Sequence, residues 1–304
     1  MTEVVDDELA ELLAEVRRIE VQSSRLATGA LAGGYTSVFR GAGIEFEEMR
    51  EYAEGDDPRT VDWNVTARLG RPFVKKFVDE RELTLLFAVD LSPSMSAGFA
   101  AWSGRQMAAR VCACMALSAV RNNDKVGLIA FGDQVERFVP PAKGLRHALR
   151  IVRDCLALPP AGGHGGLPAA LEFAAHVHRR RSILFVLSDF LTGGWQRAIA
   201  ACARRHDVIA VRLLPPELDA PGDGMVRLLD PGTGREVVVD WGSEAVRRTF
   251  ADRVARWRTA VESALRRARV DRMDVPLPRV PDRDAIARPI LEFFRVRELR
   301  GAKR

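Results

Sequence analysis

Four segments of the chain consist almost entirely of apolar residues, and each has the length of a β-strand. They are LTLLFAVDL (83–91), KVGLIAFG (125–132), SILFVLSDF (182–190) and DVIAVRLL (207–214). Runs of this kind are typical of strands that are buried on both faces of a sheet. Segments with helical apolar spacing lie between and beside them, at 105–120, 144–158, 167–180 and 195–205. This alternation predicts an α/β fold with a doubly wound, mostly parallel sheet flanked by helices.

Further elements are expected at the margins of this sheet. VERFVPP (135–141) alternates and ends in prolines, which favours an edge strand. Residues 225–240 read as a hairpin insertion that turns at 231–234. A helical stripe covers 244–268, DRMDVPL (271–277) predicts a short final strand, and 283–299 predicts a last helix. Ser103 is placed to cap the helix that follows it.

The first 80 residues have a different pattern. Residues 6–20 carry a helical stripe, and a glycine-rich stretch follows them. Residues 45–82 are rich in charge but include Phe46, Tyr52, Trp63, Phe73 and Phe77. We therefore expect residues 1–80 to form an N-terminal helix and an ordered arm packed on the main domain, with Trp63 and Phe73 as anchors. Residues 81–304 would form that main domain, including the hairpin and the C-terminal helices.

Composition and charge narrow the class of protein. The 304 residues are 47% hydrophobic and 29% charged, as in globular proteins. No apolar run is long enough for a membrane helix, and the acidic N-terminus does not resemble a signal peptide, so a cytoplasmic protein is expected. The four cysteines are expected to be reduced and buried. The whole chain has a net charge of +5, but residues 1–80 hold only 10 basic residues against 17 acidic ones. We expect this acidic segment to lie against the basic middle of the chain; the alternative is that both charged regions bind partners.

Oxygen-bearing side chains follow two of the predicted buried strands. The first strand ends in Asp90, Ser92 and Ser94, and the third ends in Ser188 and Asp189. Ligands of open α/β sheets bind beyond the carboxyl ends of the strands, and hard oxygen donors suit Mg²⁺. We therefore expect a metal site at Asp90, Ser92, Ser94 and Asp189. The alternative is that Asp and Ser after the first strand cap the next helix.

These residues resemble two known patterns. Asp90-x-Ser92-x-Ser94 together with Asp189 resembles the metal-ion-dependent adhesion site (MIDAS) of von Willebrand factor A domains. The preceding segment carries a second pattern, made of Arg40-Gly41-x-Gly43, Glu45-Phe46, Arg50-x-Tyr52, Gly55-Asp56-Asp57-x-Arg59, Asp62-Trp63, Ala67-Arg68 and Lys76. This pattern resembles the bacterial family called "domain of unknown function 58", whose members are typically encoded beside MoxR-type AAA+ ATPases. The resemblance implies a von Willebrand factor A-like fold and a MoxR-type ATPase as partner, with an unknown client.

One position departs from the adhesion-site pattern. The resemblance implies a threonine ligand in a loop between the second and third buried strands, but Gly165 stands there, preceded by His164. His164 is a candidate substitute ligand for Mn²⁺, although imidazole suits Mg²⁺ poorly. We therefore expect Mg²⁺ to be bound weakly or not at all.

The chain contains no motif of a common catalytic class. It lacks a GxxxxGK[ST] loop and a GxSxG elbow. We therefore expect a non-enzymatic protein-interaction module; the alternatives are a Mg²⁺-dependent phosphoester hydrolase that uses Asp90 and Asp189, and a metal-free scaffold. The run of arginines at 179–181 is interpreted as a solvated surface, so no nucleic acid is expected. The acidic cluster at 56–62 is interpreted as a turn, with a second metal site as the alternative.

Overall fold

The computed structural model describes residues 45–53, 56, 61–78, 82–162, 166–178, 180–219, 224–282 and 284–301, together with residues 7, 10, 11 and 14. Most of the predicted helix at 6–20 and the glycine-rich stretch after it therefore lie outside the described residues. Within the described part of the chain, no helix is both long and apolar enough to cross a membrane.

A six-stranded sheet forms the centre of the molecule, in the order β10-β7-β6-β3-β4-β5. Five strands are parallel, and the edge strand β5 pairs antiparallel with β4. The predicted doubly wound, mostly parallel sheet is therefore confirmed, as is the edge position of the proline-containing segment. The strands are β3 (Thr84–Asp90), β4 (Lys125–Phe131), β5 (Val135–Ala142), β6 (Ile183–Ser188), β7 (Asp207–Leu214) and β10 (Asp271–Pro276).

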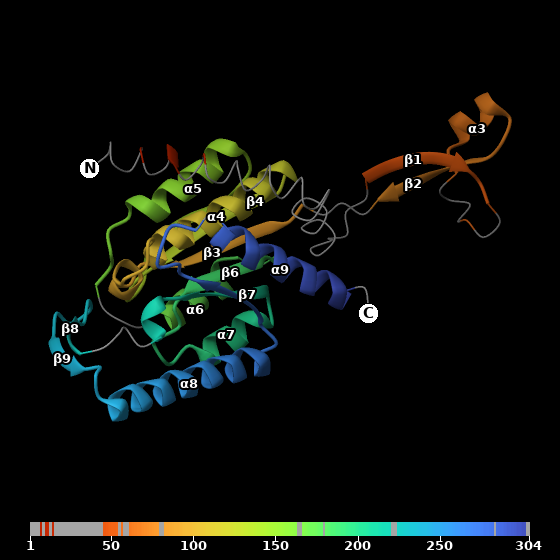
Figure 1. The fold of residues 1–304 in the computed structure, drawn as a ribbon. Helices are drawn as coiled ribbons and strands as arrows, with labels where there is room; N and C mark the ends of the chain where they lie inside the picture. Colours follow the sequence, from red (N-terminus) through yellow and green to blue (C-terminus); the bar gives the residue numbers. More distant parts are fainter. Residues whose placement is uncertain are drawn as a thin grey trace.

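Among the described residues, three helices pack on each face of the sheet (Figure 1). Side chains of α4, α5 and α9 form one hydrophobic core with the sheet, and side chains of α6, α7 and α8 form the other. All four cysteines are free and buried, as expected. The helices are α4 (Gly104–Arg121), α5 (Leu145–Ala157), α6 (Leu167–Val177), α7 (Gln196–Ala203), α8 (Glu244–Arg267) and α9 (Asp284–Gly301).

Local signals place several of these boundaries. The Ser103 hydroxyl accepts from the Gln106 backbone N–H, and the Gln106 side chain accepts from the Ser103 N–H, which together make the capping box at the start of α4. The predicted hairpin is β8 (Met225–Leu229) paired with β9 (Glu236–Asp240). It follows the short helix η3 (Pro216–Leu218). None of the residues of β8 or β9 belongs to either hydrophobic core.

The residues before the main sheet form a small unit of their own. Strand β1 (Glu45–Glu51) pairs antiparallel with β2 (Phe73–Val78), and α3 (Trp63–Leu69) lies between them in sequence. Trp63 is 72% exposed, so the prediction that it is a buried anchor is wrong. It is the first residue of a seven-residue helix that has no buried residue. Packing of residues 1–80 on the main domain stays a prediction.

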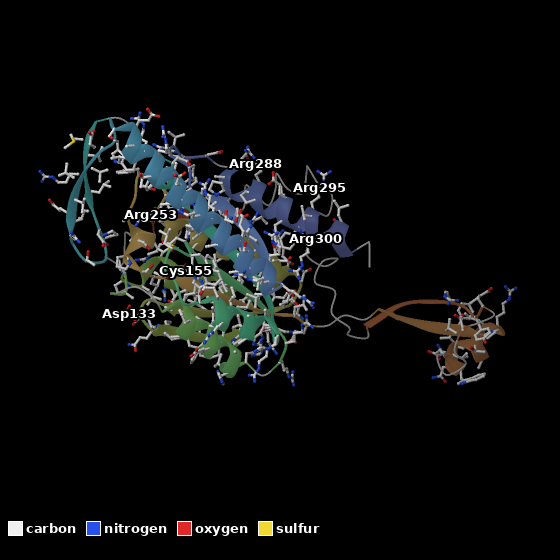
Figure 2. The ribbon with its side chains drawn as sticks, turned by 90° about the horizontal axis from the view of Figure 1, so that it is seen from below. Asp133, Cys155, Arg253, Arg288, Arg295 and Arg300 are labelled. Carbon is white, nitrogen blue, oxygen red and sulfur yellow. The ribbon has the colours of Figure 1, made fainter. Side chains whose placement is uncertain are left out.

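Arginines are abundant on the outer surface of the C-terminal helices. Figure 2 shows Arg253 on α8 together with Arg288, Arg295 and Arg300 on α9, and all four side chains are exposed. Several arginines of these helices pair with carboxylates nearby, including Arg248 with Glu244 and Arg300 with Asp271. Positive charge is thus interspersed with negative charge on these helices, as expected of a solvated surface.

Candidate functional site at the carboxyl ends of the strands

Two adjacent parallel strands bring the predicted site residues to the same edge of the sheet. Strand β3 ends at Asp90 and β6 ends at Ser188. The register pairs Val89 with Leu187, so Asp90 and Ser188 occupy the next level. The Ser188 hydroxyl donates to Asp90 Oδ2 at 2.6 Å. Asp189 follows immediately and therefore stands beside the turn that leaves β3.

A tight turn after β3 presents the two serine hydroxyls. Ser92 donates its backbone N–H to Asp90 Oδ1 at 2.8 Å, and the short helix η2 (Pro93–Ser96) begins directly after it. The Ser92 and Ser94 hydroxyl oxygens are 3.1 Å apart, and the Ser94 hydroxyl donates to Asp189 Oδ2 at 2.7 Å. The structure therefore brings all four predicted residues into one hydrogen-bonded cluster.

Helix capping does not explain these serines. Ser92 precedes η2 but makes no side-chain hydrogen bond to it. The next α-helix is capped by Ser103 instead. The Ser92 and Ser94 hydroxyls face the two carboxylates rather than the backbone of a following helix, so the alternative interpretation as helix caps is wrong.

The carboxylate of Asp90 is buried, although Asp90 is the last residue of its strand, where side chains are often solvated. Asp90 is 6% exposed and Asp189 is 5% exposed. Burial and then the nearby charge of Asp189 raise the pKa of Asp90 to about 6, against the opposing effect of hydrogen bonds from Ser188 and Ser92. Two carboxylates thus lie close together in a poorly hydrated place, where a cation would lower their mutual repulsion.

Contacts of aromatic side chains stabilise the turn that carries Asp189. Phe190 has a φ of 56°, which is uncommon for a bulky residue. Its buried ring packs edge-to-face on Trp195 at 5.3 Å, and its carbonyl accepts from Trp257 Nε1 at 3.0 Å. The Leu191 N–H closes the turn on Asp189 Oδ1 at 2.9 Å. These contacts fix the direction in which the Asp189 carboxylate points.

A polar row continues from the site across the sheet. Ser188 is level with Arg212 on β7, and Arg212 is level with Asp274 on β10. Arg212 is 2% exposed and donates to both carboxylate oxygens of Asp274, at 2.6 and 2.7 Å. It also lies 3.4 Å from Glu262 of α8. Sequence reasoning missed Arg212, although an arginine inside the apolar segment DVIAVRLL was a usable signal.

The loop expected to complete the site lies partly outside the described residues, because these exclude 163–165. The residues on either side of it adjoin the site. The Ala161 N–H donates to the Leu91 carbonyl at 3.0 Å. A Cβ on Gly166 would lie 1.9 Å from the Gly132 carbonyl oxygen, so the backbone there runs directly against the end of β4. The predictions for His164 and Gly165 stay predictions.

The chemistry of the cluster is that of a hard-cation site. Its donors are two carboxylates and two hydroxyls, which suit Mg²⁺ or Mn²⁺ better than softer metals. Among the described residues there is no group of three or more His, Cys, Asp or Glu side chains that could hold a metal ion. Any ion held by this cluster would therefore depend on its serine hydroxyls.

The acidic residues of the arm have structural roles instead. Arg50 donates to both carboxylate oxygens of Asp56, at 2.8 and 2.6 Å, and this contact lowers the pKa of Asp56. The Tyr52 hydroxyl donates to the Asp56 carbonyl at 3.1 Å. Asp62 caps α3 by accepting from the Asn64 and Val65 N–H groups. These contacts favour the interpretation as a turn and a helix cap; Asp57 lies outside the described residues.

Comparisons with known proteins identify relatives along most of the chain. A family model described as "Protein of unknown function DUF58" matches residues 48–260. Uncharacterized proteins of Mycobacterium bovis and Mycobacterium tuberculosis are each 34% identical over 269 residues, which cover 86% of this chain and 83% of the relative.

Similar solved structures include the conserved hypothetical protein BatB from Bacteroides thetaiotaomicron and the SpRpn10 VWA domain. BatB is 18% identical with a TM-score of 0.42, and the match covers 69% of this chain and 98% of BatB. The SpRpn10 VWA domain is 11% identical with a TM-score of 0.37, and the match covers 69% of this chain and 94% of that domain.

Proposed function

The chain belongs to the DUF58 family, and on that premise we propose that it is a protein-interaction module with a metal-ion-dependent adhesion-like site at Asp90, Ser92, Ser94 and Asp189. The observation that carries the proposal is the approach of two buried carboxylates and two hydroxyls at the carboxyl ends of β3 and β6. A divalent cation would balance the two carboxylates.

The proposed ion links this site to a partner. The four side chains would hold Mg²⁺ or Mn²⁺, and an ion that keeps water ligands can exchange one for a carboxylate of another protein. A MoxR-type AAA+ ATPase is the proposed partner, in the assembly or maturation of a client complex. This assignment rests on the family resemblance and not on a feature of the site.

The hydrolase alternative has less support. A nucleophilic carboxylate has to reach a phosphorus atom, but both oxygens of Asp90 already accept hydrogen bonds, from Ser188 and from the Ser92 N–H. Asp90 is also buried. A phosphatase assay with p-nitrophenyl phosphate, with and without Mg²⁺, tests this alternative directly; Mg²⁺-dependent turnover that is lost in Asp90→Asn would establish it.

Calorimetric titration of the full chain with Mg²⁺ and Mn²⁺ tests the metal site. We expect weak binding that is lost in Asp189→Asn and retained in Asp133→Asn. Asp133 is a matched control because it follows the adjacent strand β4 and is exposed. Gly165→Thr, which restores the hydroxyl implied by the resemblance, should raise the affinity about fivefold, as expected for one net hydrogen bond of about 1 kcal/mol. Equal heats in Asp189→Asn and the natural chain would refute the site and favour a metal-free scaffold.

Pull-down with a purified MoxR-type ATPase from the same host tests the partner. We expect capture in Mg²⁺ that is lost in EDTA and in Asp189→Asn, because the ion would bridge the two proteins. Capture that is identical in EDTA would show that the ATPase binds elsewhere on this chain, even if the metal site itself is real.

A further inference from the structure

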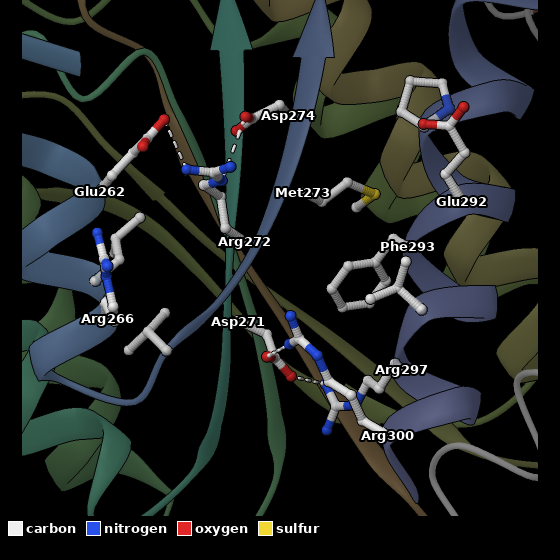
Figure 3. A pocket seen from close by; sticks show the side chains of 14 residues that line it. Glu262, Arg266, Asp271, Arg272, Met273, Asp274, Glu292, Phe293, Arg297 and Arg300 are labelled. Carbon is white, nitrogen blue, oxygen red and sulfur yellow. Dashed lines mark hydrogen bonds and ion pairs between the residues drawn. The ribbon is translucent and has the colours of Figure 1, made fainter. Parts of the chain in front are cut away.

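A cavity runs along the outer side of β10, the last strand at one edge of the main sheet. Its volume is about 570 Å³, and it is lined by residues of β10, α8 and α9 (Figure 3). Because α8 covers one face of the sheet and α9 covers the other, the cavity is a groove between the two helices with the strand edge as its floor. We call it the β10 groove.

Strand β10 forms the floor of the β10 groove. Four consecutive residues, Asp271 to Asp274, line it. Within the described part of the chain β10 pairs only with β7, so the peptide groups that face away from β7 have no strand partner. An edge of this kind matches the hydrogen-bonding pattern of an extended polypeptide, which can add to the sheet as a further strand.

The two walls of the groove differ in chemistry. Met273 belongs to the core beneath α9, and Pro289, Phe293 and Val296 add apolar side chains to that wall. The same wall also carries Glu292, and Arg297 and Arg300, which pair with Asp271 at its end. Arg272 and Asp274 point to the other face, where Arg272 contacts Glu262 of α8 at 2.7 Å. A strand in the groove would point successive side chains at these two walls in turn. The groove therefore fits a segment in which apolar and polar residues alternate.

The charges on the α8 wall leave one arginine for a ligand. Arg272 contacts Glu262 and also Asp274, at 3.3 Å, and buried Arg212 contacts the same two carboxylates. Arg266, in the last turn of α8, is exposed and forms no ion pair within the described residues, and Figure 3 draws no contact to it. Its guanidinium is free to pair with an acidic side chain of a bound segment.

We propose that the β10 groove binds an extended segment of a partner protein, which adds to the sheet edge as a strand. Its apolar side chains pack against Met273, Phe293 and Val296, and an acidic side chain on the alternate face pairs with Arg266. None of these residues belongs to the site at Asp90 and Asp189. The groove is a second docking surface, and it does not depend on the proposed metal.

Selection of peptides by the full-length protein tests the proposal. A displayed library of random dodecapeptides is the probe, and enriched peptides are synthesised and measured by fluorescence anisotropy. We expect alternating apolar and acidic residues among them. Val296→Arg should weaken their binding at least tenfold because it fills the groove from an exposed position. Leu299→Arg is the matched control, since Leu299 is exposed on the same helix but does not line the groove.

Two further readouts identify the binding mode. Arg266→Glu should change the selected peptides from acidic to basic, whereas Arg267→Glu should leave them unchanged. In a hydrogen-exchange experiment, a bound peptide should slow the exchange of the β10 backbone amides that face away from β7. Failure to enrich any peptide, binding that Val296→Arg leaves intact, or protection confined to α8 and α9 would each overturn the proposal. So would sedimentation showing a dimer that Val296→Arg separates, because the occupant would then be a second copy of this chain.

Discussion

At the scale of single residues, the most informative finding is the burial of Asp90. Burial disfavours the charged form of the Asp90 carboxyl, and the negative charge of Asp189 repels it further. Both effects raise the pKa of Asp90 from 3.8 to about 6. In the unfolded chain the group has its ordinary pKa. The folded state therefore binds the proton more tightly, and stability contributed by the protonated carboxyl is lost as the pH rises through about 6. Without a cation, ionised Asp90 is a cost to folding.

Replacement of Asp90 by asparagine should therefore stabilise the chain in the presence of chelator. Asn has nearly the same shape, retains one acceptor oxygen and carries no charge. At pH 7.5 we expect the free energy of unfolding to rise, on the order of 1–2 kcal/mol, and the gain to vanish near pH 4, where the natural residue is protonated when folded. Urea denaturation at both pH values measures it.

The control for this experiment is the exposed Asp133, whose replacement by Asn should leave the unfolding midpoint unchanged. A loss of stability in Asp90→Asn at pH 7.5 would mean that the hydrogen bonds from Ser188 and Ser92 outweigh the burial of charge. Added Mg²⁺ should raise the unfolding midpoint of the natural chain but not that of Asp90→Asn, because ligands that bind only the folded state stabilise it.

At the scale of elements, the helix α4 packs on β3, the strand that ends in the candidate site, and it starts at a complete capping box. Its side chains supply a large part of the core on one face of the sheet, and Met107, Val111 and Met115 are fully buried there. The helix also carries Arg110, which stacks over the Trp102 ring at 4.4 Å just before the helix begins. The start of α4 is therefore defined both by its cap and by packing.

Removal of the cap should weaken this element measurably. Ser103→Ala leaves the Gln106 N–H without its side-chain acceptor, and we expect a loss of about 1 kcal/mol in the free energy of unfolding. Chemical denaturation followed by circular dichroism measures it. Ser96→Ala provides the comparison, because Ser96 is an exposed serine at the end of η2; equal effects of the two substitutions would argue against a specific role for the cap.

At the scale of the whole molecule, the two hydrophobic cores define what unfolds together. They join β3, β4, β6 and β7 to helices on both faces, and the hairpin β8–β9 contributes to neither. The hairpin is attached at its base by Trp241, which is 3% exposed and packs edge-to-face on Phe250 at 4.9 Å. Beyond this base, Met225, Leu229 and Val238 are more than half exposed. A two-stranded sheet in this situation has little stability of its own.

Native-state hydrogen exchange should reveal this division. We expect the amides of β3 and β6 to exchange only through global unfolding, and those of β8 and β9 to exchange faster through local opening. Mass spectrometry of peptides that cover these strands measures both. Hairpin amides protected as strongly as those of β6 would show that the hairpin belongs to the same cooperative unit, and the inference from the two cores would then be wrong.

The sequence by itself determined the elements of the main sheet and the family, but not β1, α3 and β2 of the arm. Continuous apolar runs predict buried strands because both of their faces must leave water, and Ser103 predicts a helix start because its hydroxyl satisfies a backbone donor within three residues. The oxygen donors at the carboxyl ends of the segments 83–91 and 182–190 were recognisable for the same reason, since local sequence is enough to find polar side chains where an apolar run ends. These signals depend on a few neighbouring residues, so they can be recognised without knowledge of the fold.

Only the tertiary structure decided how distant residues meet. Strand order and register, which arise from packing over the whole sheet, decide three contacts. They make β3 and β6 neighbours, bury Asp90 against Ser188, and pair Arg212 with Asp274. The same holds for Trp63, which apolar pattern alone predicted to be buried and which the short helix α3 leaves exposed. The edge of β10, which pairs with β7 alone among the described residues, likewise results from α8 and α9 covering opposite faces of the sheet.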